Sequence, residues 1–102
     1  MLSNEIIEAV FEKTNGACRY CEKQIVFSNH GVYSRRGAWQ VDHSVSKANG
    51  GTDHLNNLFP ACIDCNQEKG SRNGASYIRW RRERNLHVPT REKPGFLDWL
   101  FG

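Results

Sequence analysis

Long apolar runs are missing from this 102-residue chain. A membrane-spanning helix needs roughly 20 consecutive apolar residues, and no stretch approaches that length. The N-terminal sequence also lacks a basic region followed by an apolar segment, which is the pattern of a secretory signal. We therefore expect a protein that works in the cytoplasm and makes no contact with a membrane.

Hydrophobic residues are scarce as well, at 38% of the chain. The length allows one domain, residues 1–102, and its core must be thin. Domains of this size often depend on a disulfide or a bound metal for stability. The cysteines of this chain are therefore the first residues to interpret.

Four cysteines form two C-x-x-C pairs separated by 40 residues: Cys18, Cys21, Cys62 and Cys65. Two such turns supply the four thiolates that a tetrahedral zinc ion requires, and four sulfurs leave no open coordination position. We expect a structural zinc ion. Disulfides and a redox dithiol are the alternatives, but a reducing compartment disfavours disulfides and a redox motif needs only one pair.

Secondary-structure signals are short. Apolar residues recur at helical spacing near the N-terminus, and two β-prone runs follow. Ser44 to Asn56 is too polar for a core element, and Pro60 limits any strand around it. We expect helices at roughly 4–14, 62–70 and 75–86 and strands at 24–27 and 39–43.

Positive charge is concentrated rather than abundant. The net charge is only +3, yet eight basic residues stand against two acidic ones from Lys69 to Lys93. On the helix expected at 75–86, this charge forms either a solvated face or a surface that binds phosphates. We favour DNA binding by Lys69, Arg72, Arg79, Arg81, Arg82 and Arg84.

Polar residues between and beside the cysteine pairs suggest a second site. His43 directly follows a carboxylate, that of Asp42, and Asn66 follows the last cysteine. Asp42 and Asn66 offer hard oxygen ligands, which suit Mg²⁺ or Mn²⁺. Adjacent residues of a regular strand point to opposite faces, so Asp42 and His43 can share a site only where the strand ends or distorts.

The combined pattern resembles an HNH endonuclease of the four-cysteine zinc type. The residues that carry the resemblance are Val41-Asp42-His43, Asn49-Gly50-Gly51, Asn57-Leu58 and Cys62-x-x-Cys65-Asn66-x-x-Lys69-Gly70, with Cys18-x-x-Cys21 upstream. They cover roughly residues 16–74. The third position of the name-giving motif is Asn66 instead of histidine, which favours hard metals such as Mg²⁺ and Mn²⁺.

The resemblance implies an α+β fold of the ββα-metal type, a β-hairpin with a long loop followed by a helix and clasped by zinc. It implies that His43 is the general base and that Asp42 and Asn66 hold one catalytic divalent cation. It further implies that Asn57 fixes the long loop and so keeps His43 oriented.

These observations predict a metal-dependent endonuclease that hydrolyses double-stranded DNA. One site per chain would nick DNA, whereas a dimer formed through the apolar tail at 96–101 would cut both strands. Two alternatives remain, a non-catalytic zinc-ribbon module that binds DNA and a zinc-stapled domain that binds an acidic protein. We expect the other three histidines, His30, His54 and His87, to lie outside the site.

Overall fold

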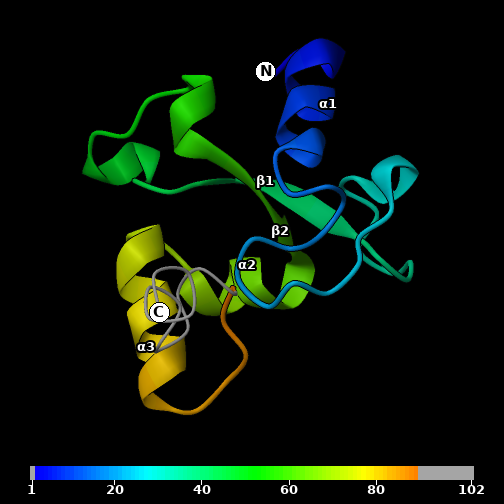
Figure 1. Ribbon diagram of the computed structural model, residues 1–102. Helices are drawn as coiled ribbons and strands as arrows, with labels where there is room; N and C mark the ends of the chain where they lie inside the picture. The colour runs from blue at the N-terminus through cyan, green and yellow to red at the C-terminus, as the bar shows by residue number, and fades with distance from the viewer. Residues whose placement is uncertain (1, 90–102) are drawn as a thin grey trace, which may run out of the picture.

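The computed structural model describes residues 2–89. Three helices and one two-stranded antiparallel sheet make up its regular structure, in agreement with the α+β fold that the sequence predicts (Figure 1). None of the helices in residues 2–89 is long and apolar enough to cross a bilayer. The elements are α1 (Asn4–Glu12), β1 (Trp39–His43), β2 (Leu58–Cys62), α2 (Ile63–Lys69) and α3 (Gly74–Glu83).

The hairpin of β1 and β2 forms the centre of the molecule. Its register pairs Trp39 with Cys62 at one end and His43 with Leu58 at the other. Pro60 lies within β2, although we expected it to limit the strand. Its carbonyl accepts a hydrogen bond from the backbone N–H of Arg19 at 2.9 Å, so the backbone polar groups of Pro60 point away from β1. The N–H that proline lacks would therefore not have bonded to β1, and the pairing of the two strands loses no hydrogen bond.

Helix α1 begins and ends close to the predicted bounds. The Ser3 hydroxyl accepts a hydrogen bond from the N–H of Ile6 at 3.2 Å and so caps the first turn. Val10 is fully buried from this helix, and Phe11 packs on Trp39 with ring centroids 5.7 Å apart. Just beyond the helix, the Lys13 ammonium donates to the carbonyls of Leu55 and Leu58, each at 2.7 Å, and ties α1 to the start of β2.

The strand expected at 24–27 is absent. An isolated bridge joins Ala17 to Gln24, and a single turn of 3₁₀-helix follows at Phe27–Asn29. Gly37 lies so close to this segment that a Cβ atom on it would be 2.6 Å from the side chain of Val26. The β-prone residues thus pack against a returning loop, and without a neighbouring strand they form no ladder.

The long loop between β1 and β2 is held by Asn57. Its amide nitrogen donates to the carbonyls of Val45 and Thr52 at 3.0 and 2.9 Å, and its oxygen accepts from the N–H of Val45 at 2.8 Å. Gly51 permits a close approach, because a Cβ there would lie 1.7 Å from the carbonyl oxygen of Val45. The loop therefore returns on itself in a defined shape directly after His43.

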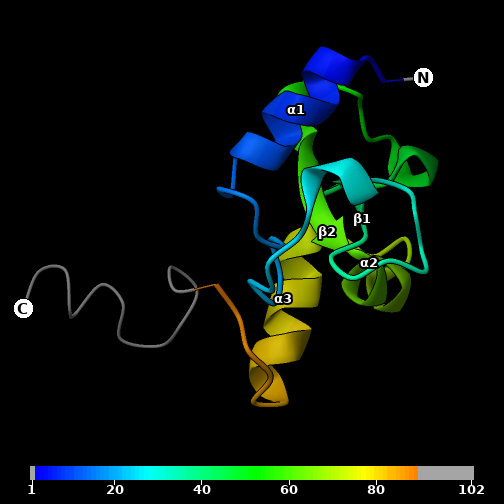
Figure 2. The same ribbon diagram turned by 90° about the vertical axis from the view of Figure 1, so that its right-hand side faces the viewer.

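Helix α1 lies above the hairpin and helix α3 below it in two perpendicular views (Figures 1 and 2). Helix α3 starts one residue before the prediction and ends three residues earlier. The N–H of Gly74 donates to the carbonyl of Ser44 at 2.9 Å, which ties α3 to the start of the long loop. Buried Tyr77 of α3 packs edge-on against Tyr20, with ring centroids 5.0 Å apart. The apolar tail at 96–101 lies outside the described residues.

Candidate functional site

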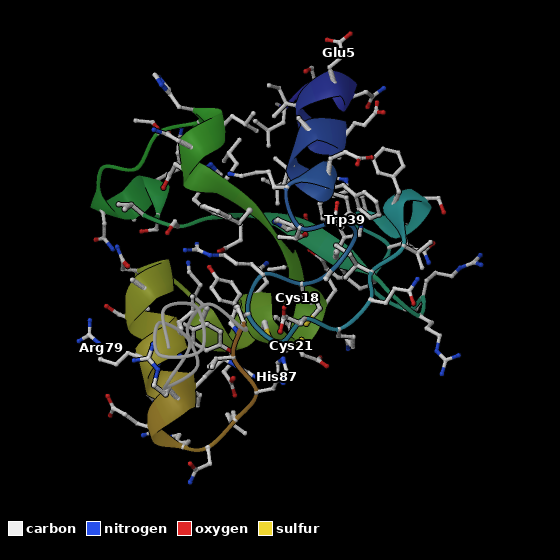
Figure 3. All side chains as sticks on the ribbon, in the orientation of Figure 1. Glu5, Cys18, Cys21, Trp39, Arg79 and His87 are labelled. Carbon is white, nitrogen blue, oxygen red and sulfur yellow. The ribbon has the colours of Figure 1, made fainter. Side chains whose placement is uncertain are left out.

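The four cysteine sulfurs lie within 4.8 Å of one another, and three of the four residues are buried. Cys18 and Cys21 reach the start of α2 from the segment that follows α1 (Figure 3). The Sγ atoms of Cys21 and Cys62 are 3.8 Å apart. Zn–S bonds of about 2.3 Å place the sulfurs of a tetrahedral site at about this separation. The cluster can therefore hold zinc, as the sequence predicts.

The surroundings of the cluster favour thiolates. A hydrogen bond from Cys18 lowers the pKa of Cys21 to about 6, whereas interaction with Cys18 raises the pKa of Cys65. The guanidinium of Arg81 approaches Cys65 Sγ at 3.8 Å and also contacts the Tyr77 hydroxyl at 3.3 Å. A fixed cation beside sulfur stabilises negative charge on the cluster.

A small hollow of about 160 Å³ lies where β1 ends. Its lining brings together Asp42, His43 and Asn66, the three residues that the sequence assigned to one site, and adds Ser46. His43 is the last residue of β1. The strand ends there, as the shared site required, and both adjacent residues border the hollow.

Asp42 is 4% exposed and has two partners. One carboxylate oxygen accepts from Lys69 Nζ at 3.1 Å and the other from the Tyr20 hydroxyl at 2.5 Å. Burial, with the neighbouring Asp42 second, raises the pKa of Tyr20, so its hydroxyl stays a donor. Lys69 is only 1% exposed and also donates to the carbonyl of His43 at 3.0 Å. Its ammonium group therefore holds both the side chain of Asp42 and the backbone of His43.

His43 is oriented by Asp53, a residue that the sequence interpretation missed. The Nε2 atom lies 2.8 Å from a carboxylate oxygen of Asp53, whose other oxygen accepts from Lys47 at 2.8 Å. Hydrogen bonds from Lys47, and then from His43, lower the pKa of Asp53 to about 2. An ionised carboxylate only accepts hydrogen bonds, so Nε2 is the donor in this contact, and in the tautomer with a single proton the lone pair is on Nδ1.

Asn66 leaves its amide available. Within residues 2–89 its side chain makes no hydrogen bond, and the same holds for Nδ1 of His43. Ser46 contributes a further unsatisfied group, because its hydroxyl oxygen is buried without a partner. Three polar groups that have no partner among residues 2–89 thus belong to residues that line one hollow, beside the carboxylate of Asp42.

These donors fit a hard divalent cation. Carboxylate, amide and hydroxyl oxygens are the ligands that Mg²⁺ and Mn²⁺ prefer. The ammonium of Lys69 and the hydroxyl of Tyr20 each occupy one acceptor position of Asp42, but an ionised carboxylate has about four. Asp42 can therefore accept those two bonds and still bind a cation together with Asn66.

The predicted DNA-binding residues fall into two groups. Lys69 and Arg81 are buried at 1% and 8% exposure and are engaged inside the protein, which speaks against direct contact with DNA. Arg79 is exposed on α3 and extends outward (Figure 3). Arg72 and Arg84 lie over the Trp80 ring, with guanidinium carbons 5.0 and 4.2 Å from its centroid. Arg82, partly exposed, is on the same helix.

The remaining histidines lie outside the hollow. His30 packs on Trp39 with ring centroids 4.8 Å apart, and burial lowers its pKa. His87 contacts a carboxylate oxygen of Glu22 at 2.8 Å, and His54 is exposed in the long loop. His30 is therefore partly a core residue, whereas the sequence suggested a solvated one.

Comparison with models of known protein families shows the family to which this chain belongs. The family model for the HNH endonuclease matches residues 18–72, more than half of the chain, and spans both cysteine pairs and the hollow. The chain belongs to the HNH endonuclease family. A search of curated proteins finds no match.

The HNH domain agrees with the fold that the sequence indicated, a zinc-stapled ββα arrangement. Two residues that hold the side chains of the hollow escaped prediction: Tyr20, which bonds to Asp42, and Asp53, which bonds to His43. Tyr20 lies between the first two cysteines and is 22 residues away from its partner Asp42. Asp53 lies in a polar loop whose path the sequence does not reveal, although its proximity to Asn49-Gly50-Gly51 could have drawn attention to it.

The buried Lys69–Asp42 pair makes a specific prediction for stability. Lys69→Met keeps the length of the side chain but leaves the Asp42 carboxylate buried with one partner fewer, which we expect to lower the free energy of unfolding by about 3–5 kcal/mol. Lys47→Met is the matched control, because the Lys47–Asp53 pair is more than half exposed and should contribute no more than about 1 kcal/mol. Urea unfolding measures both, and a Lys69→Met protein as stable as the parent contradicts the role of this pair.

Proposed function

We propose that this HNH domain is a metal-dependent DNA endonuclease that hydrolyses phosphodiester bonds. The observation that carries the proposal is the hollow at the end of β1. There an imidazole with a free Nδ1 and an amide without protein partners lie beside a fixed carboxylate. Phosphodiester hydrolysis needs a base for water and a cation for the developing charge, and this set of residues can provide both.

His43 acts as the general base. Its Nδ1 takes a proton from the attacking water, and the positive charge that develops on the ring is stabilised by the Asp53 carboxylate 2.8 Å from Nε2. Asp53 is thus a positioning residue that acts through His43. Asn57 contributes indirectly, because its three hydrogen bonds hold the loop that carries Asp53.

Asp42 and Asn66 hold the catalytic Mg²⁺ or Mn²⁺. When bound, this cation supplies charge neutralisation for the scissile phosphate and its leaving oxygen. Lys69 and Tyr20 keep the Asp42 carboxylate in place from the protein side. The products would carry 5′-phosphate and 3′-hydroxyl ends, as in the family.

Duplex DNA would lie against α3. Arg79 and Arg84 are exposed there, and with Arg72 and Arg82 they offer guanidinium groups for phosphates. Contacts of this kind position DNA without reading its sequence. One site per chain cuts one strand, so a single chain would nick DNA, while double-strand cleavage would need two chains.

A structural zinc ion in the four-cysteine cluster would complete the domain. The cluster joins the segment before β1 to the start of α2, and four thiolates leave no position for substrate. Thiols stay reduced in a compartment such as the cytoplasm, where the cluster remains able to bind zinc. The main alternative function is a non-catalytic zinc-ribbon module that binds DNA through α3 alone.

A plasmid-nicking assay tests the nuclease. Supercoiled DNA with Mg²⁺ or Mn²⁺ should be nicked by the parent, and His43→Ala should slow cleavage about 10²–10⁴-fold because the general base is lost. Asn66→Ala should also lower the rate and shift the dependence on the concentration of the divalent ion. His54→Ala is the control, since His54 lies outside the hollow. Equal rates for His43→Ala and the parent exclude His43 as the base.

The role of Asp53 is tested by Asp53→Asn, which keeps the shape of the side chain and removes its charge. We expect the rate of nicking to fall about 10–100-fold, as is typical when the partner of a site residue is lost. Asp64→Asn removes the same charge from an exposed residue of α2 and should retain the parental rate. An unchanged rate for Asp53→Asn rules out this role.

Zinc removal should unfold the domain. Metal binding of about 10–16 kcal/mol is comparable to the whole stability of a small domain, so Cys62→Ser is expected to lose both the metal and the cooperative thermal transition. Elemental analysis of the purified parent should find one zinc per chain, and a strong chelator should lower its melting temperature. A Cys62→Ser protein that retains the parental melting temperature is the result that argues against structural zinc.

A further inference from the structure

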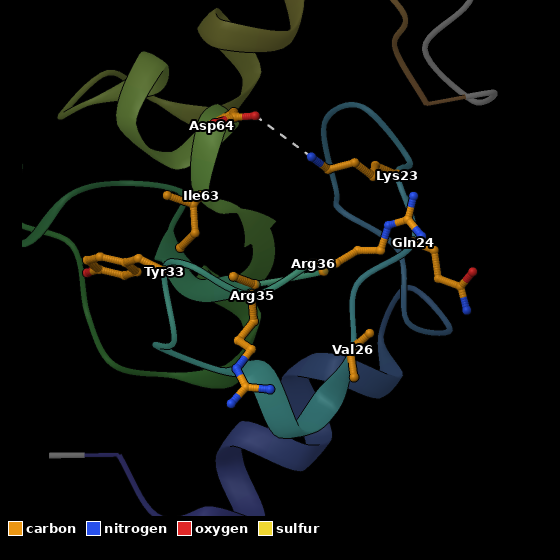
Figure 4. A pocket seen from close by; sticks show the side chains of 10 residues that line it. Lys23, Gln24, Val26, Tyr33, Arg35, Arg36, Ile63 and Asp64 are labelled. Atoms are coloured by element: carbon orange, nitrogen blue, oxygen red, sulfur yellow. Dashed lines mark ion pairs between the residues drawn. The ribbon is translucent and has the colours of Figure 1, made fainter.

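A second hollow, of about 580 Å³, lies at the end of β1 opposite His43. It is bounded by the loop before β1 and by Ile63 and Asp64 at the start of α2 (Figure 4). Neither the family pattern nor the proposed mechanism uses this part of the molecule. Its lining combines an aromatic ring with several cations: Tyr33, Lys23, Arg35 and Arg36.

Two of the three cations in this hollow have no partner in the part of the chain that the structure describes. Within residues 2–89 the guanidinium groups of Arg35 and Arg36 make no hydrogen bond and no ion pair. Lys23 lies 3.8 Å from Asp64, and both side chains are more than half exposed, so that pair is weak. Figure 4 shows Arg36 reaching toward the side of Lys23 and Gln24, and Arg35 extending away from it. The hollow therefore favours an anionic ligand.

Tyr33 gives the hollow an aromatic surface. The residue is 63% exposed, which is high for a tyrosine, and the Gln40 amide donates to its hydroxyl at 2.8 Å. That bond fixes the ring against β1 and leaves most of the side chain open to solvent. An exposed aromatic ring beside unpaired arginines is typical of surfaces that bind unpaired nucleotides by stacking and by phosphate contacts.

The two hollows lie beside the same strand, β1, and the same helix, α2. Gln40 and Asp42 are two residues apart on β1 and share one face of the hairpin. Ile63 of the second hollow and Asn66 of the catalytic hollow are three residues apart, on one side of α2. The rise of β1 is about 13 Å, so one nucleic-acid strand can contact both hollows at positions a few nucleotides apart.

We propose that the second hollow binds an unpaired nucleic-acid strand a few nucleotides from the phosphate cut at His43. Tyr33 stacks on a base, while Arg35 and Arg36 bind the phosphates beside it. A base in a duplex is stacked and offers no free face to Tyr33, so the preferred substrate is DNA in which a duplex meets a single strand. This inference rests on the proposed nuclease function, and its test is binding instead of cleavage.

Fluorescence anisotropy measures the stacking contact. The full chain carrying His43→Ala is titrated with a single-stranded 20-mer and with the duplex of the same sequence. Tyr33→Ala in this background should weaken the Kd for the single strand about tenfold, as expected for loss of one stacked base, and leave the Kd for the duplex unchanged. Tyr33→Phe is the matched control, because it keeps the ring and should bind as the parent does.

The salt dependence measures the phosphate contacts. Arg35→Ala combined with Arg36→Ala should reduce the slope of log Kd against log salt for the single strand by about 1.4, since each phosphate contact contributes about 0.7. An equal loss of affinity for duplex and single strand would overturn the preference for an unpaired strand. Parental single-strand affinity and slope in both variants would overturn the site itself.

The two proposals can fail separately. A parent that nicks plasmid while Tyr33→Ala binds the single strand normally disproves the second hollow and leaves the nuclease intact. A parent that cuts no DNA with any divalent ion, while Tyr33→Ala loses single-strand affinity, disproves the nuclease and supports the hollow as a binding site. A parent that neither cuts nor binds DNA disproves both.

Discussion

The approach of four sulfurs within 4.8 Å is the constraint on which the rest of the structure depends. It joins a turn near the N-terminus to the end of β2 and the start of α2, segments that are 40 residues apart in sequence. The hydrophobic core is small, and the two-stranded sheet alone would be marginally stable in water. With this junction in place, the segment carrying Tyr20 is held against the hairpin, and α2 starts at a fixed angle from β2.

Helix α2 connects the four-cysteine cluster to the hollow at the end of β1. Within seven residues it carries Cys65 for the cluster, Asn66 for the hollow and Lys69 for the buried ion pair. Neighbouring residues of one short helix thus face the sulfur cluster and the hollow at the end of β1. Displacement of α2 along its axis would disturb all three contacts together.

Much of this arrangement could be predicted from the sequence, because the informative residues come in fixed local patterns. Two C-x-x-C pairs indicate one cluster, and the Asp42–His43 pair followed by Asn66 indicates one hollow. The contacts that escaped prediction join distant residues through side chains: Tyr20 to Asp42, His43 to Asp53, and Arg81 to Cys65. Arg81 shows the reason most clearly, since its place in a basic helix suggested DNA and only the packing of α3 reveals that it points toward sulfur.

Local propensity was the least reliable guide. Gln24 to Phe27 has the composition of a strand, but no partner strand lies beside it and only one bridge forms. Pro60 argues against a strand, yet it occupies β2 with its carbonyl bonded to Arg19 on the outer side. In both cases the surrounding chain, and not the segment itself, decides the conformation.

The position of Tyr20 connects the four-cysteine cluster to Asp42. It lies inside the first C-x-x-C turn, so the same short stretch of backbone that positions two sulfurs also positions the hydroxyl bonded to Asp42. If zinc bound by the four sulfurs changes the affinity for a cation at Asp42 through this stretch, that cation must change the affinity for zinc by the same factor.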